Sequence, residues 1–448
     1  MSDNLSIPIN ARPAVKVQGK AAVGGTGPAT SPLSIMSTIY DSNDPKELRS
    51  IFDRFYQIAV SDPGRFNRVL EDVDGNNDRV DISSLNSGDD DKMKLAIRAM
   101  ARCIFKLGEI RGGASSLVEI SGKIRGLNGN WRVGEYFGTE IYNALAKSEP
   151  NVLFEMLNSG RVDDKVGAAL SLLRQGNHLS QNLIQAIITS SDDTRRFALI
   201  NYVDDPKFKL DILAGALDQL SDEYSKKCWG EREIINALAS FPEGRNKLEA
   251  MKAAGRINFV RVGDIYFGSL SGSGISAADL EANRAKITAA AVLINKANEK
   301  FGGRERIFYV DVTPDNDEKG NPMNVVGWGN DCLYLTIGTL SGDSERAVSF
   351  SLLHEACEQK FTRGTFSSEL GKTYISAIDQ KSNYSLIETF RLGRRINRDE
   401  FTEKYSYLGH PKDSEREWLA ETASAAIIGE PLPNKATPAL IAVTKLFR

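Results

Sequence analysis

Apolar residues recur at helical spacing through the first half of the chain and beyond. Residues 45–58 and 93–107 each place their apolar side chains on one helical face, and the first of these segments opens on proline. Shorter segments of the same kind follow between 133 and 251, and their connectors carry Gly, Asn, Asp or Pro, which end helices. The pattern predicts an all-α helical domain over residues 37–262.

The hydrophobic period changes in the last third of the chain. After a helical segment at 277–301, residues 306–312 and 332–338 are rich in β-branched and aromatic side chains, which is typical of strands. Residues 324–331 read as a strand entering a turn, so a hairpin is expected at 324–338. A further helix is expected at 345–361, capped by Asp343 or Ser344.

These patterns predict a multidomain fold class. The all-α domain is followed by a Gly/Ser-rich junction at 263–279 and an α+β domain at 280–448. Residues 1–36 hold four Gly, four Pro and no aromatic residue, so they are expected to form a disordered leader.

Composition restricts the classes of partner. The 448 residues carry 56 Lys and Arg against 59 Asp and Glu, which leaves no broad basic field for nucleic acid. No apolar run is long enough to span a membrane. Four cysteines are too few and too scattered for a disulfide framework.

The segment Leu352-Leu-His-Glu-Ala-Cys-Glu carries the strongest chemical signal. His354 and Glu358 are four residues apart, so both project from one face of the expected helix. Imidazole and carboxylate are both zinc ligands. Glu355 is the neighbouring residue and is placed to act on water as a general base. A third ligand could come from Glu421, on another segment with helical spacing.

At these residues the C-terminal domain resembles the zincin metallopeptidases, in the branch whose third ligand is a Glu on a later helix. The run from Tyr405 and Tyr407 to Leu-Ala-Glu421 is similar to the anthrax lethal-factor-like subset. The resemblance implies that His354 is the first zinc ligand, Glu355 the base and Glu421 the third ligand. It also implies that Tyr405 or Tyr407 steadies the oxyanion, and that the strand at 332–338 borders the cleft, where an extended peptide could pair with its edge.

One position departs from the zincin pattern, because Glu358 stands where the family has a second His. The second ligand is then either Glu358 or His410, or zinc is not bound. A site of one His and two carboxylates is more anionic and less selective for zinc. Cys357, three residues after His354, could form a thiolate pair with it, but a buried small hydrophobe is the favoured interpretation. His178 is interpreted as a surface residue of an inter-helix turn.

The function expected from this site is a metal-dependent peptidase that hydrolyses a protein substrate. The leader resembles in composition the uncleaved leaders of bacterial type III secreted effectors. It therefore favours a virulence effector secreted without a Sec-type signal peptide and acting on a substrate in a host cell. The alternatives are a plain terminus on a protein of the bacterial cytoplasm, a non-catalytic interaction protein with a degenerate zincin fold, and a metal-dependent amidase.

A second, weaker pattern lies near residue 75. Asp72, Asp74 and Asn76 match the first three ligand positions of an EF-hand loop, and Asp78 adds a further oxygen. Calcium is therefore a second candidate cofactor. The alternative is a solvated acidic loop, because Ser84 stands where the bidentate Glu belongs.

Overall fold

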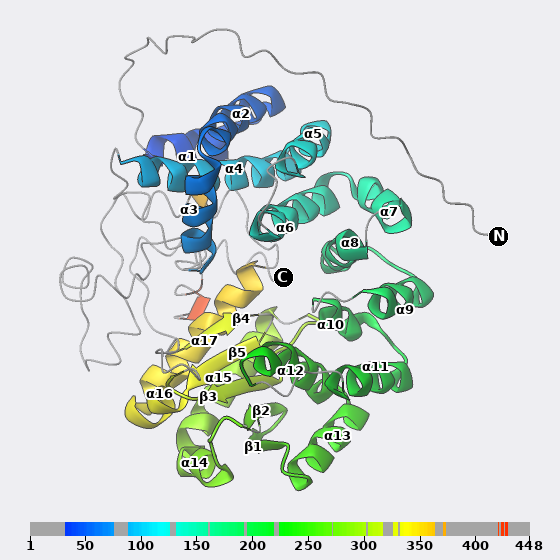
Figure 1. Cartoon of the computed structure of the whole chain (residues 1–448), viewed down its shortest axis with the longest axis vertical. Coiled ribbons are helices and arrows are strands. Elements are labelled where there is room, and N and C mark those ends of the chain that lie inside the picture. Colours follow the sequence, from blue (N-terminus) through cyan, green and yellow to red (C-terminus); the bar gives the residue numbers. More distant parts are fainter. Residues whose placement is uncertain are drawn as a thin grey trace. The chain divides into compact units, whose positions relative to one another are not determined.

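The expected succession of a helical part and an α+β part is present in the chain. The computed structural model describes residues 32–75, 88–125, 131–159, 162–191, 195–218, 224–270, 272–301, 303–316, 326–329, 332–362, 371–372, 420, 423–424 and 426–428 (Figure 1). Residues from Pro32 onward group into one compact unit.

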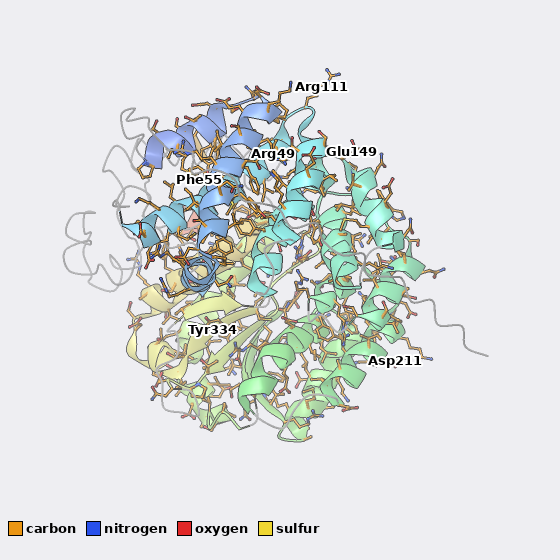
Figure 2. The ribbon with its side chains drawn as sticks, turned by 45° about the horizontal axis from the view of Figure 1, so that its top comes forward. Arg49, Phe55, Arg111, Glu149, Asp211 and Tyr334 are labelled. Carbon is orange, nitrogen blue, oxygen red and sulfur yellow. The ribbon has the colours of Figure 1, made fainter. Side chains whose placement is uncertain are left out.

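Helices make up the first part of this unit, and most of them pack on the next helix along the chain. Buried apolar side chains such as Phe55 line the contacts between them (Figure 2). The helices are α1 (Pro32–Asp41), α2 (Pro45–Ser61), α3 (Pro63–Gly75), α4 (Asp89–Glu109), α5 (Gly113–Arg125), α6 (Trp131–Ser148), α7 (Pro150–Ser159), α8 (Val162–Arg174), α9 (Gln181–Ser190), α10 (Arg196–Leu199), the 3-10 turn η1 (Ile200–Tyr202), α11 (Pro206–Asp218), α12 (Tyr224–Ala239) and α13 (Pro242–Ala253).

Proline marks the start of many of these helices. Its fixed φ suits the first helical turn, where its missing N–H would have no partner within the helix. At α2, Pro45 follows Asp44, whose carboxylate accepts the Lys46 N–H at 2.9 Å. The helix start that the sequence predicts at Pro45 is therefore confirmed.

Helix α1 corrects the expected end of the leader. The leader was predicted to extend to residue 36, but the helix begins at Pro32. Ile35 is 8% exposed and Met36 is fully buried, so both belong to the core. The Pro- and Gly-rich composition of the preceding residues concealed this start, because only the last few residues of the stretch carry the apolar pattern.

A five-stranded mixed sheet follows the helices, in the order β1-β2-β3-β5-β4. The outer pairs β1–β2 and β4–β5 are antiparallel, and β2–β3 and β3–β5 are parallel. The strands are β1 (Ile257–Val262), β2 (Ile265–Leu270), β3 (Tyr309–Thr313), β4 (Val326–Gly329) and β5 (Cys332–Thr336). The predicted hairpin is thus confirmed as β4–β5, although its second strand ends at Thr336, where the short helix α16 (Ile337–Gly342) begins.

The predicted junction at 263–279 was wrong in its first half. Residues of β2 are all buried, and β1 pairs with β2 across a tight turn in which Gly263 has a φ of +59°. The segment looks like a linker because of its Gly and Ser content, yet Ile265–Leu270 pairs with strands on both sides. Helix α12 packs on β2, β3 and β5, so the helical part is in direct contact with the sheet.

Two long helices complete the sheet region. These are α15 (Arg284–Phe301), preceded by the short α14 (Ala277–Ala282), and α17 (Glu345–Thr362). Helices α15 and α17 lie side by side (Figure 1). Helix α15 packs on β1 and β2, and α17 packs on β4 and β5.

A buried ion pair joins α12 to the central strand of the sheet. The Arg232 guanidinium donates to the Asp311 carboxylate, and the two side chains are 1% and 0% exposed. The Tyr309 hydroxyl donates to the same carboxylate at 3.1 Å. Burial and the neighbouring carboxylate raise the pKa of the Tyr309 phenol, which therefore stays neutral. Arg232 also lies 5.1 Å from the centroid of the Tyr334 ring on β5 (Figure 2 shows Tyr334).

We predict that Asp311→Ala lowers the free energy of unfolding by about 3 kcal/mol or more, because it leaves a buried guanidinium without its carboxylate. Denaturant titration followed by tryptophan fluorescence measures this. Asp264→Ala is the matched control, since Asp264 pairs with Arg261 at 3.9 Å on the surface and should cost less than about 1 kcal/mol. Equal losses in the two variants would contradict this role for the buried pair.

Candidate metal centre

Helix α17 starts where a serine satisfies its first turn. The Ser344 hydroxyl accepts the Ala347 N–H at 3.2 Å, and the Ser344 carbonyl accepts the Val348 N–H at 3.0 Å. Of the two caps predicted from the sequence, Ser344 is therefore the one used. The helix then continues to Thr362, one residue beyond the predicted end.

Helix α17 is buried on every side over most of its length. All residues from 347 to 359 are buried. With 3.6 residues per turn, His354, Glu355, Glu358 and Gln359 share an arc of about 140° on one face. Four polar side chains are therefore held together away from solvent.

The first three of these side chains form a compact cluster. His354, Glu355 and Glu358 are 0%, 8% and 1% exposed. One imidazole nitrogen and one oxygen from each carboxylate all lie within 4.8 Å of one another. Each of the three also interacts with other groups of the fold.

The chemistry of this cluster fits a divalent cation. Two carboxylates at such spacing repel each other, and burial strengthens the repulsion by lowering the local dielectric. Zinc accepts imidazole nitrogen and carboxylate oxygen at about 2.0–2.2 Å, so two ligand atoms on a tetrahedral ion lie about 3.4 Å apart. Side-chain rotations that move each ligand atom by about an ångström would bring the three groups to that spacing.

Gln359 is a site residue that sequence reasoning missed. Its side chain is fully buried, and among the described residues neither its amide nitrogen nor its amide oxygen has a hydrogen-bond partner. It lies four residues after Glu355, so the two side chains are neighbours on the helix. A buried amide without partners costs free energy, which favours a position where a further group binds. The signal in the sequence is a polar residue continuing the face of His354 and Glu358.

The remaining predicted site residues lie outside the described residues. These are the metal ligand Glu421, the alternative ligand His410, and Tyr405 and Tyr407, which were predicted to steady the oxyanion. Ala420, Ala423 and Ser424 are helical and buried, which agrees with the helix predicted around them. The convergence of Glu421 on His354 stays a prediction.

Two other interpretations from the sequence can be compared with the structure. Cys357 is fully buried within the hydrophobic core, as expected for a small hydrophobe. His178 is exposed in the turn between α8 and α9, also as expected.

The candidate calcium loop begins differently from its prediction. Helix α3 continues through Asp72 and Asp74 to Gly75, so the first two predicted ligand positions lie within a helix rather than in a loop. Asn76 and Asp78 lie outside the described residues. Calcium binding at this segment stays a prediction.

Comparison with known proteins adds no assignment, since no protein-family model, no curated protein and no solved structure matches the chain. In the described part of the chain, none of the helices has the length and apolar character needed to cross a membrane.

We predict that Gln359→Met stabilises the metal-free protein by about 1 kcal/mol and so raises its melting temperature. The substitution removes a buried amide without partners and keeps the side-chain volume. Differential scanning calorimetry in the presence of a chelator measures this. Gln181→Met is the matched control and should destabilise. Its amide donates to the Tyr202 carbonyl at 3.0 Å and accepts the Asp204 N–H at 2.9 Å. A comparable loss of stability in both variants would show that the Gln359 amide has hydrogen-bond partners.

Proposed function

We propose that the chain is a zinc-dependent peptidase whose reaction centre is the cluster His354, Glu355 and Glu358. The observation that carries the proposal is the burial of three metal-binding side chains on one helix, with their ligand atoms within 4.8 Å. The order of elements supports it as well, because a strand hairpin precedes the helix that bears the motif, with only the short α16 between them.

The residues of the cluster divide into two roles in this proposal. His354 and Glu358 hold the ion, with Glu421 as third ligand and His410 as the alternative to Glu358. A bound zinc ion would supply Lewis acidity toward the scissile carbonyl. Glu355 takes a proton from the attacking water and returns it to the leaving amine. Tyr405 or Tyr407 donates to the developing oxyanion.

The sheet suggests how a substrate would lie. The expectation that residues 332–338 form the accessible edge was wrong, because β5 is paired on both sides, with β3 and β4. In the described part of the sheet, β4 is the strand at that edge. An extended segment of a protein substrate could add to β4, where main-chain hydrogen bonds would align its scissile bond with α17.

The setting of the activity is part of the same proposal. We infer that the protein is exported without a Sec-type signal peptide and cleaves a protein of a host cell. The composition of residues 1–36 supports this, and Pro32–Arg448 forms a separate compact unit.

We predict that the purified chain cleaves a mixture of unstructured peptides in a zinc-dependent manner. Glu355→Gln should lower kcat at least about 100-fold, because it removes the proton acceptor. It should leave zinc content unchanged if Glu355 is the base rather than a ligand. Mass spectrometry of the products and metal analysis of the same samples measure both effects.

The control for this experiment is Glu299→Gln, an exposed carboxylate on α15, which should keep full activity. Zinc binding without any cleavage, in wild type as in Glu355→Gln, would contradict the catalytic role and favour the non-catalytic interaction protein. Cleavage of small amides but not of peptides would favour the amidase.

A further inference from the structure

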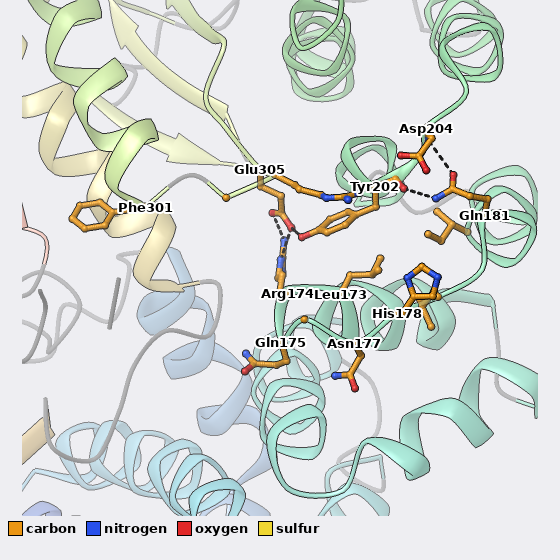
Figure 3. A pocket seen from close by; sticks show the side chains of 15 residues that line it. Leu173, Arg174, Gln175, Asn177, His178, Gln181, Tyr202, Asp204, Phe301 and Glu305 are labelled. Carbon is orange, nitrogen blue, oxygen red and sulfur yellow. Dashed lines mark hydrogen bonds and ion pairs between the residues drawn. The ribbon is translucent and has the colours of Figure 1, made fainter. Parts of the chain in front are cut away.

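A cavity of about 470 Å³ lies between the helical part and the segment that leads into β3 (Figure 3). One wall comes from the end of α8, the turn to α9 and the start of α9, and the other from η1, Phe301 and residues 303–305. None of the lining residues belongs to α17. The volume is typical of sites for small molecules. The cavity is therefore a candidate binding site independent of the proposed reaction centre.

The walls of the cavity are held together by Glu305. Its carboxylate accepts two hydrogen bonds from Arg174, both at 2.9 Å, and one from the Tyr202 hydroxyl at 2.8 Å (Figure 3). The Gln181 amide holds the backbone that follows Tyr202, through the Tyr202 carbonyl and the Asp204 N–H. These bonds connect α8, α9 and η1 to the chain before β3, so the cavity is formed before any ligand arrives.

The turn from α8 to α9 is fixed as well. Gly176 adopts a φ of +80°, and the Asn177 N–H donates to the Leu172 carbonyl at 3.0 Å. The carbonyls at the end of α8 are thus capped by backbone N–H groups. The turn places His178 in the cavity wall, with its imidazole labelled in Figure 3.

Among the charged side chains in the described lining of the cavity, Arg304 is a cation without a carboxylate partner. The negative charge of Glu305 is matched by Arg174. Arg304 is exposed, its guanidinium lies 5.9 Å from the Tyr202 ring centroid, and no carboxylate of the described residues pairs with it. Asp204 is the other acid of the lining, and Lys209 lies close enough to both Asp204 and Arg304 for its pKa to respond to them. The positive charge of Arg304 is therefore not neutralised within the cavity.

Apolar side chains form another part of the lining, beside polar ones such as Gln175 and Asn177. Leu173, Leu179, Ile184, Phe301 and the Tyr202 ring contribute the hydrophobic surface. A guanidinium matches the geometry of a phosphate or carboxylate, and it is pre-oriented here by the aromatic ring below it. We propose that this cavity binds a small-molecule anion with an apolar body, whose phosphate or carboxylate pairs with Arg304 while the apolar body contacts the leucine and isoleucine side chains.

Calorimetric titration of the full chain with phenyl phosphate tests the proposal, with phenol as the neutral probe. Phenyl phosphate is expected to bind with a Kd below about 1 mM, and phenol at least about tenfold more weakly. Arg304→Gln should weaken phenyl phosphate about tenfold and leave phenol unchanged.

The matched control is Arg111→Gln. Arg111 is exposed in the turn between α4 and α5, far along the chain from the cavity lining, and extends outward in Figure 2. The Arg111→Gln variant should bind phenyl phosphate with the same affinity as the unaltered chain. Equal affinity for phenol and phenyl phosphate, an equal loss in Arg111→Gln, or no binding at about 10 mM phenyl phosphate would each overturn the proposal. These outcomes do not depend on zinc, so they leave the proposed peptidase activity untouched.

Discussion

The candidate metal centre depends on one physical constraint, which is the burial of α17. A helix that is covered on all sides over residues 347–359 cannot leave its polar side chains to water. His354, Glu355, Glu358 and Gln359 must therefore be satisfied by the fold or by a bound group. An isolated buried carboxylate would be costly, whereas two carboxylates beside an imidazole are the donors that a divalent cation accepts.

The surrounding layers hold α17 in place. Helix α15 lies along it, and strands β4 and β5 contact it. In the same sheet, Asp311 on β3 and Tyr334 on β5 are neighbours in the strand register and both contact Arg232 of α12. The close packing extends to Gly268 on β2, where a Cβ would lie 2.9 Å from the Tyr309 ring. The helical part is thus attached to the sheet that positions the cluster, rather than connected to it by a flexible linker.

How much of this was predictable depends on the distance along the chain between interacting residues. His354, Glu355 and Glu358 lie within one turn and a half of a single helix, so their spacing in the sequence was enough to bring them together. Strand β2 was missed because its local composition of Gly and Ser resembles a loop, and because its second partner, β3, is distant along the chain. The importance of Gln359 depends on burial, which spacing does not reveal. The cavity joins Arg174 to Glu305, 131 positions apart, and no local pattern connects the two residues.

The most direct test of the central claim is the absorption spectrum of the cobalt(II)-loaded protein, because cobalt(II) takes the same nitrogen and oxygen ligands as zinc and reports its coordination. We expect one cobalt ion per chain, with the visible bands of a four- or five-coordinate site, and we expect zinc to displace the cobalt. His354→Ala should abolish these bands, and His178→Ala should leave them unchanged. Absence of the bands at saturating cobalt, or their persistence in His354→Ala, would contradict the assignment of the metal centre to α17.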